Sequence, residues 1–456
     1  MKPVLVSSHK IARNDKAMSS RAAWSFLIGI LIVQAILTLS AIDRSFLPYG
    51  TSGLAELRAL VKDGVIPTNG LRAFGEGFHH PGPLYILLLA IPYLCWPHIV
   101  SGYYFLGICN GLTALGVFLM GKRFFNVSVG LWAAAFYVGS WVAIAPRDLE
   151  SISFVPLFVL CVMAATSELV IRKRSAAVIF LLPLFIATLQ LHLSALSLVP
   201  VIGWALWASR KSLRARDMFI GLGASLILMA PYCIRGWWED LPALMGLMHN
   251  PRLHRDAPYL AVLGTGLLLE PNYFTAIHAY PFDFHVVGRA ISLSIWGVFV
   301  FWLGAVWHVV RWSRSGLASS LNRPTVIMLF LWNVAPLFLW GLSEPLLVIH
   351  YLLPAKMGSF FISALLAAKL TSRERGVTLS RFRHWLRPML RASCLAGLLL
   401  ANAIAYERPF LWNQTVQIPQ AYGFVARTLS GQNPEWFAPP RVGQHPMFRQ
   451  RSIFDQ

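Results

Sequence analysis

The chain has 456 residues, of which 56% are hydrophobic and only 13% are charged. Ordinary soluble domains carry roughly 25% charged residues, so this composition excludes a soluble enzyme, a disordered chain and a disulfide scaffold. The net charge is +20, from 39 Lys and Arg against 19 Asp and Glu. Basic residues gather in the cytoplasmic loops of membrane proteins, and no basic stretch here is interleaved with stacking aromatics. We therefore expect a polytopic membrane protein that binds no nucleic acid.

The N-terminal region predicts a cytoplasmic tail and a first transmembrane helix. Residues 1–21 are rich in Lys and Arg, and the uncharged run 22–42 follows. This run is longer than the ~7–15-residue apolar core of a signal peptide, so it indicates an uncleaved span. A first outer loop, 43–100, comes next. Within it, helical periodicity predicts an amphipathic surface helix over 54–64, and the short apolar stretch 83–97 predicts a helix lying in the outer interface.

The uncharged run 175–209 predicts a hairpin. At ~1.5 Å per residue it is too long for one crossing of a ~30 Å hydrocarbon core. Basic residues flank both ends, at 172–174 and 210–216, so both ends favour the cytoplasm. Two short spans with a turn near 189–194 satisfy this condition. The turn then places Gln190 and His192 at the outer surface.

Further uncharged runs predict the remaining spans, at 101–121, 124–146, 151–167, 218–234, 290–310, 324–343, 392–406 and 345–355, the last extended to 368. The expected fold is all-α, with about eleven transmembrane helices plus the interfacial helices of the first outer loop. The transmembrane domain covers 22–405. It includes a second large outer loop, 235–289, whose aromatic residues favour the interface. The tail 406–456 lies on the outer side.

The sharpest local pattern is the elbow motif His79-His80-Pro81-Gly82-Pro83. Each imidazole can donate a hydrogen bond to an oxyanion, so the pair predicts contact with a phosphate or a sugar. The alternative is a structural turn whose histidines bond to backbone carbonyls. Metal ligation by this pair is disfavoured, because adjacent residues rarely point at one ion.

Other polar residues of the predicted outer side are candidates for chemistry. A carboxylate of the first outer loop, Glu56 or Asp43, could act as a general base for an acceptor hydroxyl, or Glu56 could simply be solvated. Asp148 and Glu150 could position an acceptor or a divalent cation, or pair with Arg147 structurally. A histidine on an apolar turn near the membrane is costly, which favours a functional role for His192.

The segment 343–356 places His350, Tyr351 and Lys356 near the outer end of an apolar span. Lys356 could extend its amine to the surface, or it could hold a lipid-linked phosphate as a point charge.

Three runs carry a resemblance to a known family: GEGFHHPGPLYILLLAIPY (75–93), LQLHLSALSLVP (189–200) and HYLLPA (350–355). The chain resembles bacterial membrane glycosyltransferases of the GT-C superfamily. The nearest group is glycosyltransferase 39 and its RgtA-B-C-D-like relatives, which are related to protein O-mannosyltransferases and the lipid A aminoarabinose transferase. The family carries an acidic residue at the start of the helix that corresponds to 52–64, where this chain has Ser52-Gly53.

The resemblance implies a multi-pass protein of the cytoplasmic (inner) membrane with its active site on the periplasmic or extracellular side. It would transfer a sugar, with inversion, from a polyprenyl-phosphate donor to a glycan, lipid or protein acceptor. Its expected residues fall into three groups. The catalytic candidates are Glu56, Asp43 and Asp148. The donor phosphate would be bound by His79, His80, Arg72 and Lys356. The acceptor or sugar would contact Glu150, Gln190, His192, His350 and Tyr351.

Two other functions are compatible with the sequence. A transporter or lipid flippase would also be polytopic, although the chain shows none of the internal symmetry that many transporters have. A non-catalytic partner of a glycan-assembly complex would explain the missing acidic residue at 52–53. The implied partners are the lipid-linked donor, the acceptor and membrane lipid. No cofactor is indicated beyond a possible divalent cation, and the motifs do not specify a metal site.

Overall fold

A computed structural model describes these parts of the chain: residues 20–42, 53–70, 79–96, 101–144, 151–242, 300–311, 323–341 and 352–371. Every regular element among them is a helix, which confirms the expected all-α class. Within these ranges, four helices are long and apolar enough to cross a membrane: Ser101–Phe124, Ser151–Arg172, Ala215–Pro242 and Leu353–Leu370. The count of about eleven spans and the domain boundaries stay predictions.

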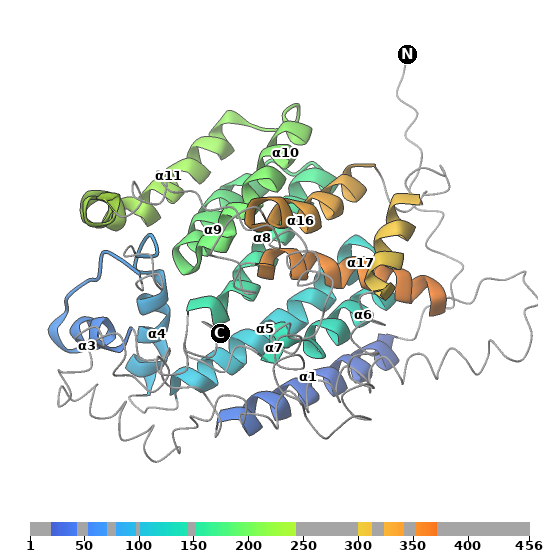
Figure 1. The fold of residues 1–456 in the computed structure, drawn as a ribbon, viewed down its shortest axis with the longest axis horizontal. Coiled ribbons are helices and arrows are strands. Elements are labelled where there is room, and N and C mark those ends of the chain that lie inside the picture. Colours follow the sequence, from blue (N-terminus) through green and yellow to red (C-terminus); the bar gives the residue numbers. More distant parts are fainter. Residues whose placement is uncertain are drawn as a thin grey trace, which may run out of the picture.

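Helix α1 (Ser20–Ile42) lies along α5 (Ser101–Phe124) and α6 (Val127–Val138) at one edge of the molecule (Figure 1). Between α5 and α6 the side chain of Asn126 accepts a 2.9 Å hydrogen bond from the backbone N–H of Val129 and caps α6. Glycines on both helices let their backbones approach closely, as small residues do in membrane proteins.

The expected span 124–146 is not one continuous helix. α6 ends at Val138, and a turn at Gly139–Ser140 separates it from the short α7 (Trp141–Ile144). The Ser140 hydroxyl donates a 2.7 Å hydrogen bond to the backbone carbonyl of Tyr137, in competition with helical pairing. The uncharged sequence alone did not reveal this interruption.

The run 175–209 forms the expected hairpin. It follows α8 (Val155–Arg172), which a short 3-10 turn, η2 (Ser151–Phe154), precedes. The run consists of α9 (Ala177–Leu191), the 3-10 turn η3 (Leu193–Leu198) and α10 (Val199–Ser209).

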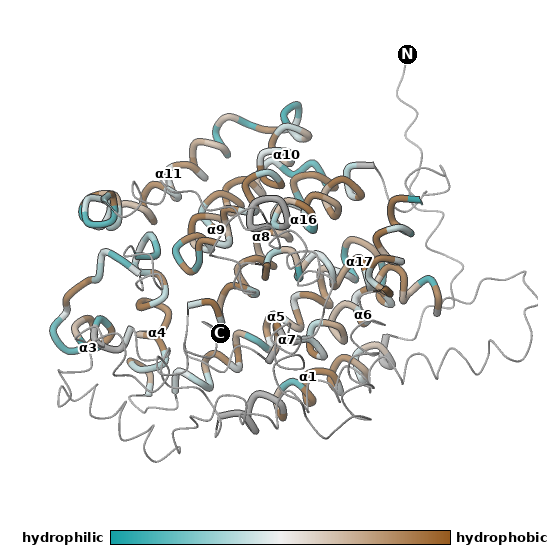
Figure 2. Tube along the Cα trace, viewed as in Figure 1, coloured by the Kyte–Doolittle hydropathy of each residue, from teal (hydrophilic) through white to brown (hydrophobic). Residues whose placement is uncertain are grey.

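The two basic segments that flank the hairpin are joined by hydrogen bonds. The ammonium of Lys173 donates to the backbone carbonyl of Ala208 at 3.3 Å, and the backbone N–H of Arg214 donates to the hydroxyl of Ser175 at 2.8 Å. Hydrophilic residues gather at these helix ends, as at the turn between α10 and α11 (Figure 2).

Helix α11 (Ala215–Pro231) continues through one turn of π-helix, η4 (Tyr232–Gly236), and remains helical to Pro242. The second outer loop was expected to begin at residue 235, so this helix extends several residues into it. π-helical turns inside α-helices are frequent at functional sites. Outward-facing apolar residues cover much of α11, with Phe219 and Ile227 each more than 70% exposed, as expected for a surface against lipid.

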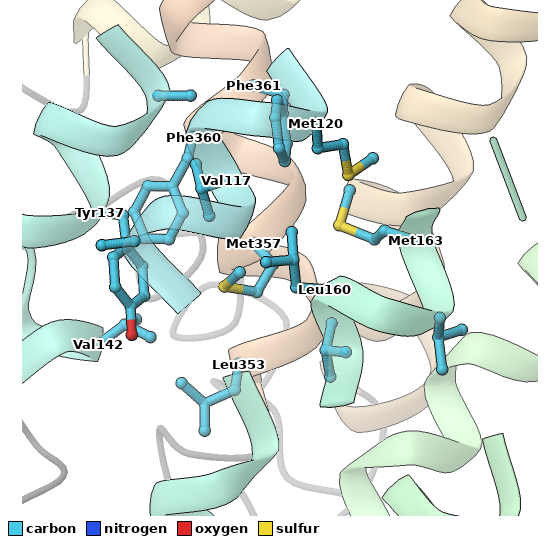
Figure 3. Close-up of a cluster of buried hydrophobic side chains, with 14 of the residues drawn as sticks. Val117, Met120, Tyr137, Val142, Leu160, Met163, Leu353, Met357, Phe360 and Phe361 are labelled. Atoms are coloured by element: carbon cyan, nitrogen blue, oxygen red, sulfur yellow. The ribbon is translucent and has the colours of Figure 1, made fainter. Parts of the chain in front are cut away.

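The core lies between α5, α6, α8 and α17 (Leu353–Thr371), with α16 (Arg323–Gly341) packed against α17. Figure 3 shows Val117, Leu160, Met357 and Phe360 meeting at the centre of this core, and the aromatic rings of Tyr137 and Phe360 are in edge contact. The first turn of α17 is fixed because the indole N–H of Trp332 donates to the carbonyl of Pro354 at 2.7 Å.

The first outer loop contributes two short helices, α3 (Leu54–Asp63) and α4 (Leu84–Cys95), which pack against each other. Both were expected as helices, and both are confirmed. Their placement at a membrane interface stays a prediction. They lie at one end of the bundle, near the end of α11 (Figure 1). The expected span 392–406 and the first part of 290–310, residues 290–299, lie outside the described residues, and residues 300–311 form a helix.

Candidate active site at the His-His-Pro elbow

The elbow motif, residues 79–83, is the centre of a polar cluster at the end of the bundle that holds α3 and α4. Its backbone is held by the carbonyl of His80, which accepts hydrogen bonds from Gly70 and from Gly82, each at 2.9 Å. Gly82 has φ +113°, which a residue with a side chain rarely adopts. A Cβ at Gly82 would also lie 2.4 Å from Cδ of Gln190, so the turn of the α9–α10 hairpin packs closely against the elbow.

Two buried histidines face each other beneath this contact. The rings of His80 and His192 have centroids 5.2 Å apart, and the residues are 7% and 4% exposed. The backbone N–H of Ser194 donates to Nδ1 of His192, so the ring proton of the neutral form lies on Nε2. Nδ1 of His80 is buried and has no hydrogen-bond partner among the described residues.

His80 is neutral at physiological pH. Burial, and to a lesser degree the charge of His79, lowers its pKa to about 4. The chain therefore keeps an uncharged imidazole with an unused ring nitrogen inside the cluster. Since a buried polar atom without a partner is costly, this atom marks a place where a ligand group could bind.

His79 is held by an acid from a distant part of the chain. Its Nδ1 lies 2.9 Å from Oδ1 of Asp240, and its backbone N–H donates to the same oxygen at 3.0 Å. The hydroxyl of Tyr232 donates to the other oxygen, Oδ2, at 2.9 Å. The Asp240 side chain is 1% exposed and that of His79 is 32% exposed. The Nδ1 side of the His79 ring is therefore held by Asp240, and the side chain remains partly exposed to solvent.

Sequence reasoning missed Asp240 and Tyr232. Both were assigned to a span end or an outer loop without a role. The available signal was an acid pair, Glu239-Asp240, directly after Trp237-Trp238 at the end of an apolar helix. The helical continuation of α11 through η4 is what brings Tyr232 and Asp240 onto the elbow.

The segment before the elbow is packed onto the same helix end. The amide of Asn69 donates to Oε2 of Glu239 at 2.9 Å, and a Cβ at Gly236 would collide with the Asn69 side chain. From the hairpin turn, the amide of Gln190 donates to the backbone carbonyl of Leu228 at 2.7 Å. The cluster is therefore built from the 69–70 segment, the elbow, the hairpin turn and the end of α11.

Glu56 lies in the first turn of α3 at the edge of this cluster. Its side chain reaches solvent, yet neighbouring protein atoms displace water from the carboxylate and raise its pKa above the ordinary value of 4.5. Its backbone hydrogen bond and the charge of His79 act in the opposite direction. α3 packs against α4, the helix that follows the elbow.

The remaining expected site residues separate into two groups. Gln190 and His192 lie at the hairpin turn, as expected, but they are buried beneath the elbow instead of lying at the surface. Lys356 is fully buried in the first turn of α17, so it does not extend to the surface. α17 packs against η3, the turn that follows His192. The others lie outside the described residues: Asp43, Arg72, Asp148, Glu150, His350 and Tyr351.

No group of three or more His, Cys, Asp or Glu side chains is placed to hold a metal ion within the described parts of the chain. The expected divalent cation therefore has no ligand set among these residues. The cluster instead offers hydrogen-bond donors and one carboxylate with a raised pKa, which suits the binding of an oxyanion beside a proton acceptor.

The arrangement of the helices is similar to that of two solved structures, an oligosaccharyltransferase and ArnT. The oligosaccharyltransferase of Archaeoglobus fulgidus, tethered to an acceptor peptide, superposes with a TM-score of 0.52 at 13% identity over 84% of this chain. ArnT from Cupriavidus metallidurans in the apo state gives 0.51 at 14% identity over 90% of this chain.

The chain spans 55% of the oligosaccharyltransferase and 76% of ArnT. No protein-family model matches the sequence, and the search of curated proteins finds no match. The similarity is therefore one of fold.

Proposed function

We propose that the protein is an inverting glycosyltransferase that transfers a sugar from a polyprenyl-phosphate donor to a glycan, lipid or protein acceptor on the outer face of the cytoplasmic membrane. The observation that carries the proposal is the convergence of His79, His80, His192 and Glu56 at one end of a GT-C fold.

The histidines of the elbow would bind the donor phosphate. His79 presents the open edge of its ring, and the unused Nδ1 of neutral His80 can donate to a phosphate oxygen when it carries the ring proton. Arg72 and Lys356 would add positive charge. Phosphate is a good leaving group, so stabilising its charge suffices and no strong general acid is required.

Glu56 would act as the general base, with Asp43 and Asp148 as the alternatives. Its carboxylate takes the proton of the acceptor hydroxyl, the acceptor oxygen bonds to the anomeric carbon, and the bond from that carbon to the phosphate oxygen breaks. The polyprenyl phosphate leaves with the electron pair. A carboxylate whose pKa is raised is a stronger base than an ordinary glutamate, which favours this assignment. Gln190, His192, Glu150, His350 and Tyr351 would contact the sugar or the acceptor.

The test is transfer of labelled sugar by purified protein in detergent, with a panel of polyprenyl-phosphate sugars as donors. Glu56→Gln should lower the rate by at least about 100-fold if this carboxylate is the base. Asp63→Asn is the matched control, because Asp63 is an exposed acid at the far end of the same helix, and it should leave the rate unchanged.

Loss of activity in Asp43→Asn but not in Glu56→Gln would move the base to Asp43 and keep the transferase. Tight lipid binding without turnover of any donor would contradict the transferase and favour a non-catalytic or transport role.

A further inference from the structure

The carboxylate of Asp240 is buried at the elbow, and two residues, His79 and Tyr232, contact its oxygens. Oδ1 accepts from the backbone and faces Nδ1 of His79, and Oδ2 accepts from the hydroxyl of Tyr232. Because both oxygens are engaged, the carboxylate cannot rotate freely. Nδ1 of His79 must then carry a proton toward Oδ1, since two acceptors 2.9 Å apart would repel.

Fixing Nδ1–H determines what the opposite nitrogen can do. Since Nδ1–H is held by Asp240, Nε2 is the ring nitrogen that remains for a ligand, and it can donate when the ring carries its second proton. Nε2 lies on the part of His79 away from Asp240, and the side chain is 32% exposed. A proton on Nε2 can therefore be offered to a ligand oxygen outside the cluster.

We propose that Asp240 is a positioning residue for His79: it fixes the imidazole with Nδ1–H toward the carboxylate, so that Nε2, when it carries a proton, donates to a phosphate oxygen of the lipid-linked donor. Tyr232 orients Asp240 in turn. The inference rests on the proposed function, because it assumes that the ligand is the polyprenyl phosphate. It adds two residues to the site that neither the motifs nor the fold similarity assigns.

The charged and titratable groups around His79 come from three elements. Asp240 at the end of α11 and Glu56 on α3 are acids, and His80 of the elbow, which is neutral, adds no charge. Tyr232 keeps its proton and donates it to Asp240. Glu239 and Arg235 lie on the same helix end and pair with each other at 3.9 Å. Among these groups only Asp240 bonds to the ring, so its removal should dominate.

The experiment measures binding of a polyprenyl monophosphate to the purified full chain between pH 5 and 9, with the uncharged polyprenol as the reference lipid. In the wild type, binding of the phosphate should fall as rising pH removes the proton from His79. Asp240→Asn should move the midpoint of this fall to lower pH by about one unit or more and weaken binding at pH 7 about tenfold. Binding of the polyprenol should not change.

Three variants separate positioning from general damage. Asp63→Asn removes an exposed carboxylate at the far end of α3 and should behave as wild type. Tyr232→Phe keeps the Asp240 charge, so the midpoint should move much less than in Asp240→Asn. His79→Gln should abolish the pH dependence, and adding Asp240→Asn to it should have no further effect.

Two results overturn the inference while leaving the proposed function intact. One is an Asp240→Asn protein that binds the phosphate as wild type does, while His79→Gln does not. The other is a loss that is equal at every pH and equal for polyprenol, which indicates a purely structural role. If the wild type binds neither lipid, that result contradicts the proposed function itself.

In that case, titration of the histidine rings by NMR still tests the role of Asp240. Equal titration midpoints of His79 in wild type and Asp240→Asn would refute the inference.

Discussion

At the scale of single residues, His80 shows how burial keeps an imidazole in its neutral form. The backbone around His80 is held by two hydrogen bonds to its own carbonyl, and the ring is packed among neighbouring atoms and only 7% exposed. Burial then keeps the ring neutral, in contrast to its neighbour His79, whose ring is partly exposed and bonded to a carboxylate. Two adjacent histidines therefore lie in different surroundings, one buried and one partly exposed.

This difference predicts a loss of stability in acid. The folded-state pKa of His80, about 4, lies below its ordinary value of 6.5, so the unfolded chain binds the proton more readily. Stability is present in full above pH 6.5 and falls as the pH drops toward 4, by about 2 kcal/mol at pH 5 and about 3 kcal/mol at the limit. Thermal unfolding in detergent of wild type and His80→Asn, between pH 4 and 8, measures it. The variant should lose less stability than wild type on acidification, and parallel curves would contradict the burial argument.

At the scale of elements, the pairing of α5 and α6 depends on the absence of two side chains. A Cβ on Gly121 would lie 2.5 Å from Cα of Gly130, and a Cβ on Gly130 would lie 2.5 Å from the carbonyl oxygen of Phe118. These neighbours are backbone atoms, which cannot rotate away as a side chain would. The two helices also contribute to the core beside α17, so their spacing sets the position of Tyr137 against Phe360.

We therefore expect Gly121→Ala to force the helices apart and to destabilise the protein by about 1–3 kcal/mol, as overpacking does. Gly111→Ala is the matched control in the same helix, because a Cβ there meets no atom within 4 Å. Alanine favours the helix by up to about 1 kcal/mol over glycine, so the control should be neutral or slightly stabilised. The unfolding temperatures of both variants in detergent measure the effect. Equal temperatures would mean that α5 and α6 can shift without cost.

The sequence predicted where helices lie more completely than where they are interrupted or end. Charge flanks and length were enough for the 175–209 hairpin, because a basic residue at each end constrains the path between them. They were not enough for the break at Gly139–Ser140, which depends on a side-chain hydrogen bond within an uncharged run. They also missed the helical extension of α11 to Pro242, since its Trp and acidic residues are equally typical of an interfacial loop.

At the scale of the whole molecule, the candidate site depends on long-range contacts that local patterns do not specify. The elbow and the hairpin turn could be recognised separately as polar features on the same predicted side. The pairing of His79 with Asp240 joins positions 161 residues apart, and it requires the end of α11 to lie over the elbow. The sequence therefore predicted the residues of the elbow and the hairpin turn, but it did not predict Tyr232, Asp240 or how these parts come together.

The same arrangement separates two kinds of polar surface. The carboxylate of Glu168 pairs with Arg123, Arg172 and Arg174 at the end of the bundle where the basic turns meet. The elbow cluster lies at the opposite end of α9, whose 15 residues span about 22 Å. A basic end and an end bearing the site, separated by apolar helices, are what a membrane protein with an outward-facing site requires.

This separation predicts which residues a membrane-impermeant thiol reagent can reach. In a background without the five native cysteines, Asp63→Cys reports on the elbow end and Lys211→Cys on the basic end, and both positions are exposed. In intact bacterial spheroplasts the reagent should label Asp63→Cys alone, because basic loops are retained in the cytoplasm. Lysis should make Lys211→Cys reactive as well, which shows that the residue is accessible. Labelling of Lys211→Cys before lysis, with Asp63→Cys protected, would invert the orientation and place the elbow on the cytoplasmic side, where a donor presented at the outer face could not reach it.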